Sequence, residues 1–449
     1  MLNWLYLALD RYGTSSSARI ARSAWLAPGW LLRRISEAKL VRTLRHVWKN
    51  SPPQRRRWQD AGVRWRDLRS PAVLPRVPFL NPDELTEHPE FFFCVPKSEF
   101  THIMRTSGTG GRHRKVYLTT EDIDYQARML GAGLRRLPGA SCVLVLIAPI
   151  EPTLGPGEMA LRSAEKAGML AFQVSTGKDP KEHVEYIREF QPDVLISTPT
   201  WVHRVTLEAD TDLKALGVKY IVLSSQPIGR ELRGQLEAAW GATVIDFYAT
   251  NECACGVASE CEHGEGLHIA ETDFWLEIVD PETGRPLDEG EEGEIVITTL
   301  SRRGMPLVRY RIGDLSRFVG GRERCACGVA LRKIAPIKGR VDHMLILGSG
   351  YNIYPDEFDG AILAVPGVSD YQLTVEKRGF NDVLHLTVES REASDGLDAA
   401  LREALLGIEY VRHNVVDRSH VVLDRFDVVP PGTLSRGRRK SVRIVDKRV

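Results

Sequence analysis

A glycine-rich stretch, "RTSGTGGRHRKV", runs from Arg105 to Val116. Three glycines within four positions let the backbone turn its amide groups toward an anion, because no Cβ atoms stand in the way. Ser107 and Thr109 add hydroxyl donors, and Arg112, Arg114 and Lys115 add positive charge. The stretch lacks the Walker pattern G-x-x-x-x-G-K-[ST]. Taken alone it fits a phosphate-binding loop and a plain surface turn equally well.

Four later segments carry residues that a nucleotide site needs. "DFYATNE" (246–252) ends an expected strand with an aromatic residue and a carboxylate, and "RYRIGDLSRF" (309–318) places an aspartate after a glycine. "IKGRVDHMLILGSGYNIYPDEFD" (337–359) links two domains, and "LSRGRRKSVRIVDKR" (434–448) places a lysine near the end. Carboxylates can accept from a ribose diol and bind magnesium, and a lysine can stabilise a point where two anions meet. The five segments together favour a nucleotide site.

In this order, the segments resemble the adenylate-forming superfamily and, within it, the phenylacetate–coenzyme A ligase family. The resemblance extends over nearly the whole chain, from "VRTLRHVWKNSPPQRRRWQDAGV" to the final "IVDKR", and its most specific stretches are "IVDPETGRPLDEGEEGEIVITTLSRRGMPLVRYRIGDL", "CACG" and "GRVDHMLILGSGYNIYP". It implies an ATP-dependent acid–thiol ligase. Such an enzyme adenylates a carboxylic acid, by default an aromatic one, releases pyrophosphate, and then forms a thioester with coenzyme A as AMP leaves.

The resemblance also implies roles for individual residues. Tyr248 corresponds to the aromatic residue beside adenine, Asp314 to the acid that binds the ribose hydroxyls, and Arg340 to a further nucleotide contact. Glu252 corresponds to the carboxylate that holds Mg²⁺, and Lys440 to the mobile catalytic lysine of the small domain. The nucleotide-phosphate loop corresponds to Thr106, Ser107, Gly108, Thr109, Gly110, Gly111 and Arg112. Taken singly, each could instead be a core aromatic, a surface carboxylate or part of a solvated basic tail.

Several positions depart from the family pattern. Gly110 replaces a threonine, Arg112 a lysine, Gln226 an acid, Ala249 a glycine, and Arg439 the glycine before the catalytic lysine. These changes indicate a substrate other than phenylacetate, or impaired chemistry. They motivate two alternatives: an adenylating enzyme that passes its acyl group to an amine or another nucleophile, and a non-catalytic homologue that serves in binding. The retained carboxylates and lysine argue against the second alternative.

The elements that position these residues follow from the apolar pattern. Between about 140 and 250, short runs rich in Val and Ile alternate with helical stretches at 157–168, 179–190 and 229–241, which predicts parallel α/β layers. Ligands of such sheets bind outside the carboxyl ends of the strands, so residues 197–200, 224–227 and 248–252 are expected to form a pocket rim. Trp201 could be a flat pocket wall or a core residue. The candidate pocket residues are Trp201, Ser224, Ser225, Gln226, Tyr248 and Ala249.

A chain of 449 residues exceeds one comfortable core. We expect an α/β fold with a helical segment over residues 1–75 packed on a large domain of parallel and mixed sheets over 76–338. Alternation over 267–320 predicts a β-hairpin or a small β-barrel-like unit in that domain. A small mobile α+β domain covers 341–449, with strands expected at 383–390 and 420–429 and a helix at 396–407. By resemblance Asp342 is the hinge. Helical spacing over 36–50 suggests Ser36 as a cap; the preceding 18–35 either packs on the body or rests on a membrane surface or partner.

Five of the seven cysteines crowd into two places, "CACGVASEC" and "CAC". Thiolates and imidazoles suit zinc, and similar Cys/His positions occur in some members of the resembled family. The preferred structural zinc ligands are Cys261, His268, Cys325 and Cys327, with His263 as the competing imidazole. A group of reduced, partly buried thiols is the alternative. Cys253 and Cys255 lie close to the magnesium carboxylate and could instead line the active site.

Composition narrows the partners. A formal net charge of +1 gives no reason to expect nucleic acid as a partner. No apolar run reaches the roughly 20 residues that a membrane span requires. The N-terminal stretch lacks a basic leader followed by a cleavage site, so a cytoplasmic location is the default expectation. A homodimer is also allowed by the sequence.

Overall fold

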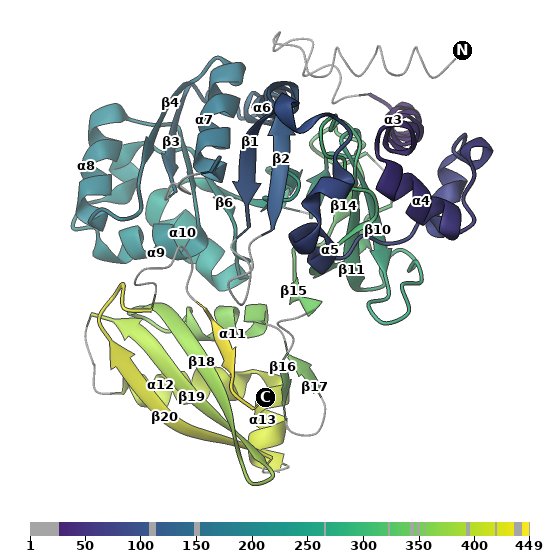
Figure 1. Cartoon of the computed structure of the whole chain (residues 1–449). Helices are drawn as coiled ribbons and strands as arrows, with labels where there is room; N and C mark the ends of the chain where they lie inside the picture. Colours follow the sequence, from purple (N-terminus) through teal and green to yellow (C-terminus); the bar gives the residue numbers. More distant parts are fainter. Residues whose placement is uncertain are drawn as a thin grey trace.

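A computed structural model describes residues 27–106, 114–147, 153–264, 266–321, 324–341, 345–347, 351–353, 355–391, 396–417, 420–434 and 442–448. The chain forms a large lobe that ends near residue 340 and a small lobe below it (Figure 1). Three groups of predicted site residues lie outside the described residues: loop residues 107–112, Asp342 and Lys440. The predicted domain limits at 75/76 and 338/341 stay predictions.

The centre of the large lobe is a nine-stranded mixed sheet in the order β13-β14-β9-β8-β7-β6-β5-β3-β4. Its strands are β3 Cys142–Leu146, β4 Leu170–Val174, β5 Val194–Ser197, β6 Tyr220–Ser224, β7 Thr243–Thr250, β8 Cys255–Ser259, β9 Leu267–Ile269, β13 Phe318–Val319 and β14 Lys333–Ile334. Strands β4, β3, β5, β6 and β7 are parallel, as the alternating pattern predicted. Strand β5 is buried along its whole length, because helices cover both faces of the parallel part.

Helices cover the two faces of this sheet. They are α6 Thr120–Leu134, α7 Pro156–Ala167, α8 Pro180–Phe190, α9 Pro199–Glu208 and α10 Arg230–Trp240. Residues of α6 and α7 pack with Val143, Val222 and Ile245 on one face. Residues of α8, α9 and α10 pack with Leu144 and Leu223 on the other. The predicted helices 157–168, 179–190 and 229–241 are therefore confirmed.

The ends of the glycine-rich loop belong to a two-stranded hairpin. Strands β1 Phe100–Arg105 and β2 Lys115–Thr119 pair antiparallel, and Arg105 is the partner of Lys115. Helix α6 follows β2 directly and begins with a capping box, in which Thr119 Oγ1 accepts from the Asp122 amide and Asp122 Oδ2 accepts from the Thr119 amide. The hairpin and the helix therefore form one continuous unit that fixes both ends of the loop.

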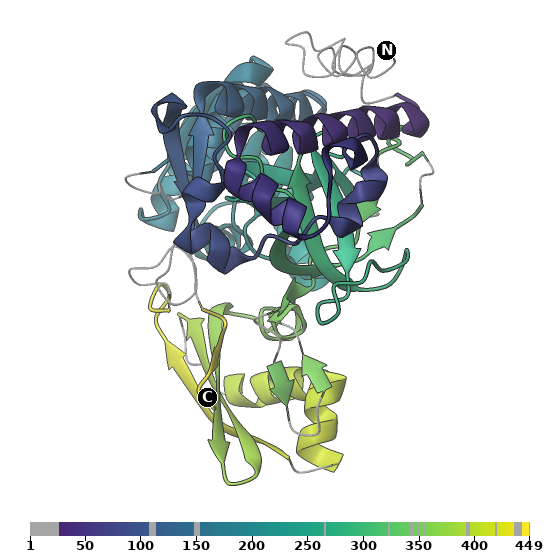
Figure 2. The same cartoon turned by 45° about the vertical axis from the view of Figure 1, so that its right-hand side comes forward.

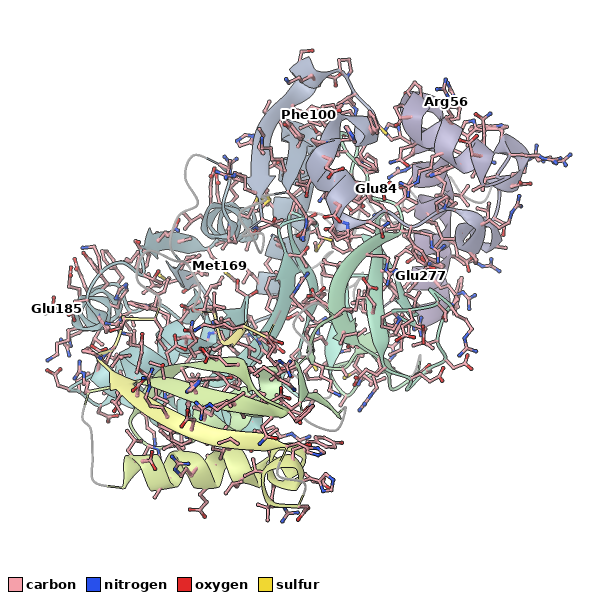
Figure 3. All side chains as sticks on the ribbon, turned by 60° about the horizontal axis from the view of Figure 1, so that its bottom comes forward. Arg56, Glu84, Phe100, Met169, Glu185 and Glu277 are labelled. Atoms are coloured by element: carbon pink, nitrogen blue, oxygen red, sulfur yellow. The ribbon has the colours of Figure 1, made fainter. Side chains whose placement is uncertain are left out.

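The predicted hairpin between 267 and 320 is confirmed. Strands β10 Phe274–Val279 and β11 Gly293–Thr299 pair antiparallel, and β12 Tyr310–Ser316 and β15 Gly339–Arg340 complete a four-stranded sheet. Within the described residues this sheet is open rather than a closed barrel. In Figure 3, Glu277 of β10 lies on the opposite side of the large lobe from Met169 and Glu185, which mark the parallel part.

The N-terminal part is helical, but its first helix begins earlier than predicted. Helix α3 spans Gly29–Asn50 and lies across the large lobe (Figure 2). Ser36 is therefore no cap: it is buried inside the helix and donates to the Glu271 carbonyl. The exposed face is basic, as expected, and includes Arg33, Arg34 and Lys49. Residues 18–26 of the stretch with a predicted surface role lie outside the described residues.

One lysine of α3 faces inward. Lys39 is fully buried, and its Nζ donates to Asp273 Oδ1 (3.1 Å) and to Tyr125 (2.9 Å). The shorter elements of this region are α4 Pro52–Asp60, α5 Pro82–Glu87 and the 3-10 turns η1 Trp65–Asp67, η2 Pro71–Arg76, η3 Pro89–Phe92 and η4 Lys97–Glu99. A further 3-10 turn, η6 Leu213–Leu216, lies between α9 and β6. None of the helices in the described ranges is both long and apolar enough to cross a lipid bilayer.

The small lobe is an α+β unit. Its sheet has the order β20-β19-β18-β21, and the predicted strands 383–390 and 420–429 and the predicted helix 396–407 are confirmed. A hairpin of β16 Leu345–Leu347 and β17 Tyr351–Ile353 precedes it. The other elements are α11 Pro355–Ile362, β18 Val368–Arg378, β19 Asn381–Ser390, α12 Leu397–Gly407, α13 Glu409–Arg412, η8 His413–Asp417, β20 Val421–Val429 and β21 Ile444–Asp446.

Candidate active site

The two ends of the glycine-rich loop are held against the turn that follows β7. Thr106 is buried; its amide donates to the Arg114 carbonyl (3.1 Å), and its Oγ1 accepts from the Arg114 amide (3.2 Å). Asn251 Nδ2 donates to the Arg105 carbonyl (2.6 Å). Arg114 Nη1 donates to Glu252 (2.9 Å). These bonds bring the loop ends to the predicted magnesium carboxylate, 138 residues away in sequence.

Glu252 is buried, and the hydrogen bonds from described residues to its carboxylate all reach one of the two oxygens. Its Oε1 accepts from Arg114 and from the Tyr310 hydroxyl (3.2 Å), and its backbone carbonyl accepts from Arg302 (2.7 Å). Burial raises the pKa of Tyr310 well above its ordinary value, so this hydroxyl stays protonated and donates. Within the described ranges, Glu252 Oε2 has no hydrogen-bond partner. The carboxylate is therefore oriented by one oxygen and presents the other.

Tyr248 and Asp314 are in direct contact. The Tyr248 hydroxyl donates to Asp314 Oδ2 (2.6 Å), and Arg340 Nη1 donates to Asp314 Oδ1 (3.1 Å). Burial, followed by the neighbouring Asp314 charge, raises the pKa of Tyr248 well above its ordinary value. Gly313 has φ +83°, and a Cβ there would lie 2.9 Å from Arg340 Nη2. A glycine at this position lets the arginine pass close to the backbone and reach the carboxylate.

A cavity of about 440 Å³ begins beside these residues. Three of the predicted pocket residues, Ser224, Ser225 and Ala249, line its wall. Ser225 has φ +76°, which is strained for a residue with a side chain. Ser224 Oγ is buried and has no hydrogen-bond partner among the described residues. The cavity thus opens at the carboxyl ends of β6 and β7, where the sequence placed a pocket rim.

The other predicted pocket residues lie elsewhere. Tyr248 belongs to the contact with Asp314, outside the cavity wall of the described residues. Trp201 packs edge-on against His183, with 5.2 Å between the ring centroids, as part of the core on the α9 side of the sheet. Gln226 Oε1 accepts from Thr200 Oγ1 (2.8 Å). Trp201 is therefore placed as a core residue, the alternative that the sequence left open.

An arginine of the small lobe reaches the same strand ends. Arg443 Nη2 donates to Thr200 Oγ1 of the large lobe (3.0 Å), and its guanidinium also lies 3.4 Å from Asp359 and 3.2 Å from Asp370. Its side chain is only 12% exposed. Burial lowers the pKa of Arg443, but the two carboxylates outweigh it and hold the pKa above its ordinary value. A fixed positive charge therefore ties the two lobes together.

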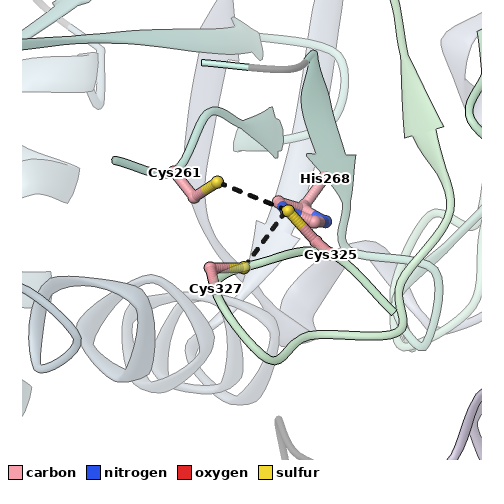
Figure 4. Close-up of side chains that lie close together, drawn as sticks. All are labelled: Cys261, His268, Cys325 and Cys327. Carbon is pink, nitrogen blue, oxygen red and sulfur yellow. Dashed lines mark hydrogen bonds between the residues drawn. The ribbon is translucent and has the colours of Figure 1, made fainter. Parts of the chain in front are cut away.

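The predicted cysteine–histidine set is brought together (Figure 4). The ligand atoms of Cys261, His268, Cys325 and Cys327 all lie within 4.8 Å of one another. The Sγ atoms of Cys261 and Cys325 are 3.8 Å apart, and Cys327 Sγ lies 3.5 Å from His268 Nε2. The competing His263 is exposed and faces Glu262 instead. Cys253 is fully buried, and burial raises its thiol pKa to about 12.

Sequence reasoning gave no role to several residues of this site. Tyr310 lies inside the most family-specific stretch but carried no assignment, and Arg302 precedes it. Arg114 stood out only as one cation of the loop. Arg443 is one of several cations in a basic tail, and its spacing carries no signal that separates it from its neighbours. Only the fold shows which of these cations meets buried acids.

Comparisons with known proteins agree with this geometry. Residues 53–301 match the model of the AMP-binding enzymes, and residues 350–448 match that of the AMP-binding enzyme C-terminal domain. The chain is 34% identical over 397 residues to a phenylacetate–coenzyme A ligase of Thermus thermophilus, which covers 87% of this chain and 86% of that protein.

Solved structures of 2-hydroxyisobutyryl-CoA ligase share the fold. Its postadenylation state, in complex with 2-HIB-AMP, has a TM-score of 0.77 at 25% identity and covers 93% of this chain and 89% of that one. Its thioesterification state, in complex with 2-HIB-AMP and CoA, covers the same shares at the same identity but has a TM-score of 0.64. The present chain is thus more similar to the first state than to the second.

Proposed function

Because the chain belongs to the AMP-binding enzymes, and within them to the phenylacetate–coenzyme A ligase family, we propose that it joins a carboxylic acid to coenzyme A through an acyl-adenylate. It is an AMP-forming acid–thiol ligase. The acid carboxylate attacks the α-phosphorus of ATP. The bond between the α-phosphorus and the oxygen that bridges to the β-phosphorus breaks, and pyrophosphate leaves. The coenzyme A thiol then attacks the acyl carbon, AMP leaves, and a thioester remains.

The observation that carries this proposal is the network around the loop ends. Asp314, which Tyr248 and Arg340 hold in place, is assigned to the ribose hydroxyls, because one carboxylate can accept from both of them. Glu252 Oε2 would hold a magnesium ion, which would neutralise charge on the ATP phosphates, since hard oxygen ligands suit this ion. Loop residues 107–112 cradle the phosphates, and Lys440 supplies positive charge at the reacting oxygens. These assignments are supported by the positions of the described neighbours and by the family pattern.

The small lobe acts in both half-reactions. The similarity in lobe arrangement to a postadenylation state supports a docked form in which Arg443 binds the large lobe. Rotation about Asp342 would then exchange this form for one that admits coenzyme A. On this basis we also propose that the chain divides into 1–75, 76–338 and 341–449. We propose a cytoplasmic location, where ATP and coenzyme A are available, and an aromatic acid as the default substrate. A homodimer stays an expectation.

Two half-reactions test the function. Acid-dependent exchange of labelled pyrophosphate into ATP measures adenylation, and AMP release with and without coenzyme A measures the acceptor. We expect exchange without coenzyme A and AMP release that depends on it. AMP release at the same rate without the thiol, and faster with an amine, would favour the other acceptor. Absence of exchange with every acid would leave only a binding role.

The Cys261–His268–Cys325–Cys327 cluster is proposed as a structural zinc site. Tetrahedral zinc with bonds of ~2.3 Å to sulfur and ~2.0 Å to nitrogen separates two sulfurs by about 3.8 Å, and sulfur from nitrogen by about 3.5 Å. The separations in the cluster are 3.8 Å and 3.5 Å. Four protein ligands leave no position for substrate, so the metal would join the β8–β9 turn to the loop before β14.

Loss of the zinc is expected to destabilise the large lobe. A site filled at a hundred times its Kd adds about 2.7 kcal/mol to the free energy of unfolding, and Cys325→Ser or Cys327→Ser should remove it. Elemental analysis should find one zinc per wild-type chain and less than a tenth of that in either variant. Cys94→Ser is the control, since Cys94 is buried in another core. Equal melting temperatures for all variants, with no bound zinc, would refute the site.

A further inference from the structure

The cavity continues far beyond the reacting centre. It is lined by Tyr220, Val222 and Ser224 of β6, alternate residues that share one face of the strand. The same holds for Thr243, Ile245, Phe247 and Ala249 of β7. At ~3.3 Å per residue, the four steps from Tyr220 to Ser224 along β6 cover about 13 Å, and the six steps from Thr243 to Ala249 along β7 cover about 20 Å. The cavity is therefore a channel along the sheet, from the carboxyl ends toward the amino ends.

Helix α6 forms the opposite wall. Met129, Leu130, Gly133, Leu134 and, beyond the helix end, Leu137 all line the channel. The five steps from Met129 to Leu134 at ~1.5 Å rise span about 8 Å, and Leu137 continues the wall beyond the helix end. The far end lies at Pro138, which is exposed and whose carbonyl accepts from the Tyr220 hydroxyl (3.1 Å). The channel thus runs from the site to the surface.

The packing around Phe247 indicates that the channel is open space. Phe247 lies in the middle of β7, which has hydrogen-bonded strands on both sides, yet its side chain is only half-buried. The walls are mostly apolar. Gly256 makes room beside it, since a Cβ there would lie 2.2 Å from the Phe247 ring and 2.6 Å from Leu130. A side chain at Gly256 would therefore push both residues toward the channel.

We propose that the channel holds the tail of the acid substrate, and that the enzyme prefers acids with an extended apolar body of roughly 13 to 20 Å over compact acids such as phenylacetate. This rests on the proposed function. The near end is continuous with the reacting centre: Ala249 follows Tyr248, Asn251 precedes Glu252, and the unpartnered Ser224 hydroxyl lies where the carboxylate must enter. An apolar lining suits an alkyl or aryl-alkyl tail better than a charged one.

Gly133 offers a direct test. A Cβ added to it has no atom within 4 Å, so Gly133→Leu and Gly133→Phe extend into the channel without a clash at their Cβ atoms. Leucine also favours a helix over glycine. Gly234 of α10 is a matched control: it is helical, equally open and outside the channel wall. Ala160→Leu, from α7 on the same wall, is the second variant.

The experiment measures kcat/KM for ω-phenylalkanoic acids, from phenylacetate to phenyldodecanoate, with the full-length wild type and each variant. For the wild type we expect kcat/KM to rise by up to about fourfold per added methylene and to level off once the tail reaches solvent. Gly133→Leu and Ala160→Leu should lose at least tenfold more kcat/KM on the longest acids than on phenylacetate. Gly234→Leu should match the wild type throughout.

The possible results distinguish a wrong channel assignment from a wrong proposed function. Turnover of phenylacetate with no gain from chain length, and no effect of Gly133→Leu on long acids, overturns the tail channel and leaves the ligase function standing. A rise in the KM of coenzyme A alone in Gly133→Leu also overturns it, since the channel would then hold the pantetheine arm. Absence of pyrophosphate exchange with every acid refutes the proposed function and the channel assignment together.

Discussion

Glu252→Gln is expected to lower acid-dependent pyrophosphate exchange by about 10²- to 10³-fold, the range seen when one electrostatic contact to a transition state is removed. The amide keeps the shape and can still accept from Arg114 and Tyr310 through its oxygen. It replaces the anionic Oε2 by an uncharged donor, which cannot bind magnesium. The variant should therefore fold normally and show its defect in kcat at saturating ATP.

Glu277→Gln is the matched control. Glu277 is also a carboxylate with little exposure, and it pairs with Arg309 at 3.0 Å on β10, away from the nucleotide residues. It should keep its exchange rate within about twofold, although its stability falls as for other broken buried pairs. If Glu252→Gln kept more than a tenth of the wild-type rate at every magnesium concentration, the assigned role of Glu252 would be wrong.

Arg443→Met has the second large expected effect, on stability and on one half-reaction. Removing the guanidinium leaves Asp359 and Asp370 facing one another with little exposure, which should cost about 3 kcal/mol of unfolding free energy. It also removes the bond to Thr200 that joins the lobes. Pyrophosphate exchange should fall, while thioester formation from supplied acyl-adenylate should fall much less. Chemical denaturation and the two half-reaction rates measure these effects.

Two further variants separate stability from lobe docking. Thr200→Val removes the bond that Arg443 donates between the lobes and the bond that Thr200 donates to Gln226. A bond to a charged group contributes about 1.5 kcal/mol or more, close to a tenfold change in a docking equilibrium. It should slow adenylation about tenfold with unchanged melting. Arg448→Met breaks pairs with Asp382 and Asp446 inside the small lobe, so it should lower stability and keep the ratio of the half-reactions. Equal loss of both half-reactions in Thr200→Val would exclude the docking role.

Much of the fold could be predicted because its signals are local. The buried runs of β3, β5 and β6 consist largely of Val, Ile and Leu, and the helices between the strands have a 3.6-residue period. The error at Ser36 arose because a serine before an apolar run reads as a cap. Here the helix had already begun at Gly29, and the serine bonds across to Glu271.

Only part of the candidate site could be predicted from the sequence. Tyr248 and Asp314 could be named from family motifs, and the fold places them 2.6 Å apart. The cysteine–histidine set could be named from residue types, although "CAC" is a tight spacing. The channel and Arg443 could not be predicted, since both depend on contacts between distant segments. The sequence left Trp201 open as a pocket wall or a core residue, and the fold places it in the core on the α9 side of the sheet.

Side chains of strand β7 point alternately to its two faces, so neighbouring residues of the strand contact different sites. Ile245 and Phe247 face the channel, whereas Tyr248 turns to the Asp314 carboxylate. Since the channel is proposed to hold the acid, a randomised library at positions 222, 245 and 247 is expected to change the preferred acid without altering Tyr248 and Asp314, the residues proposed to bind ATP. Such a scaffold would diversify its chemistry by changing one face of a strand at a time.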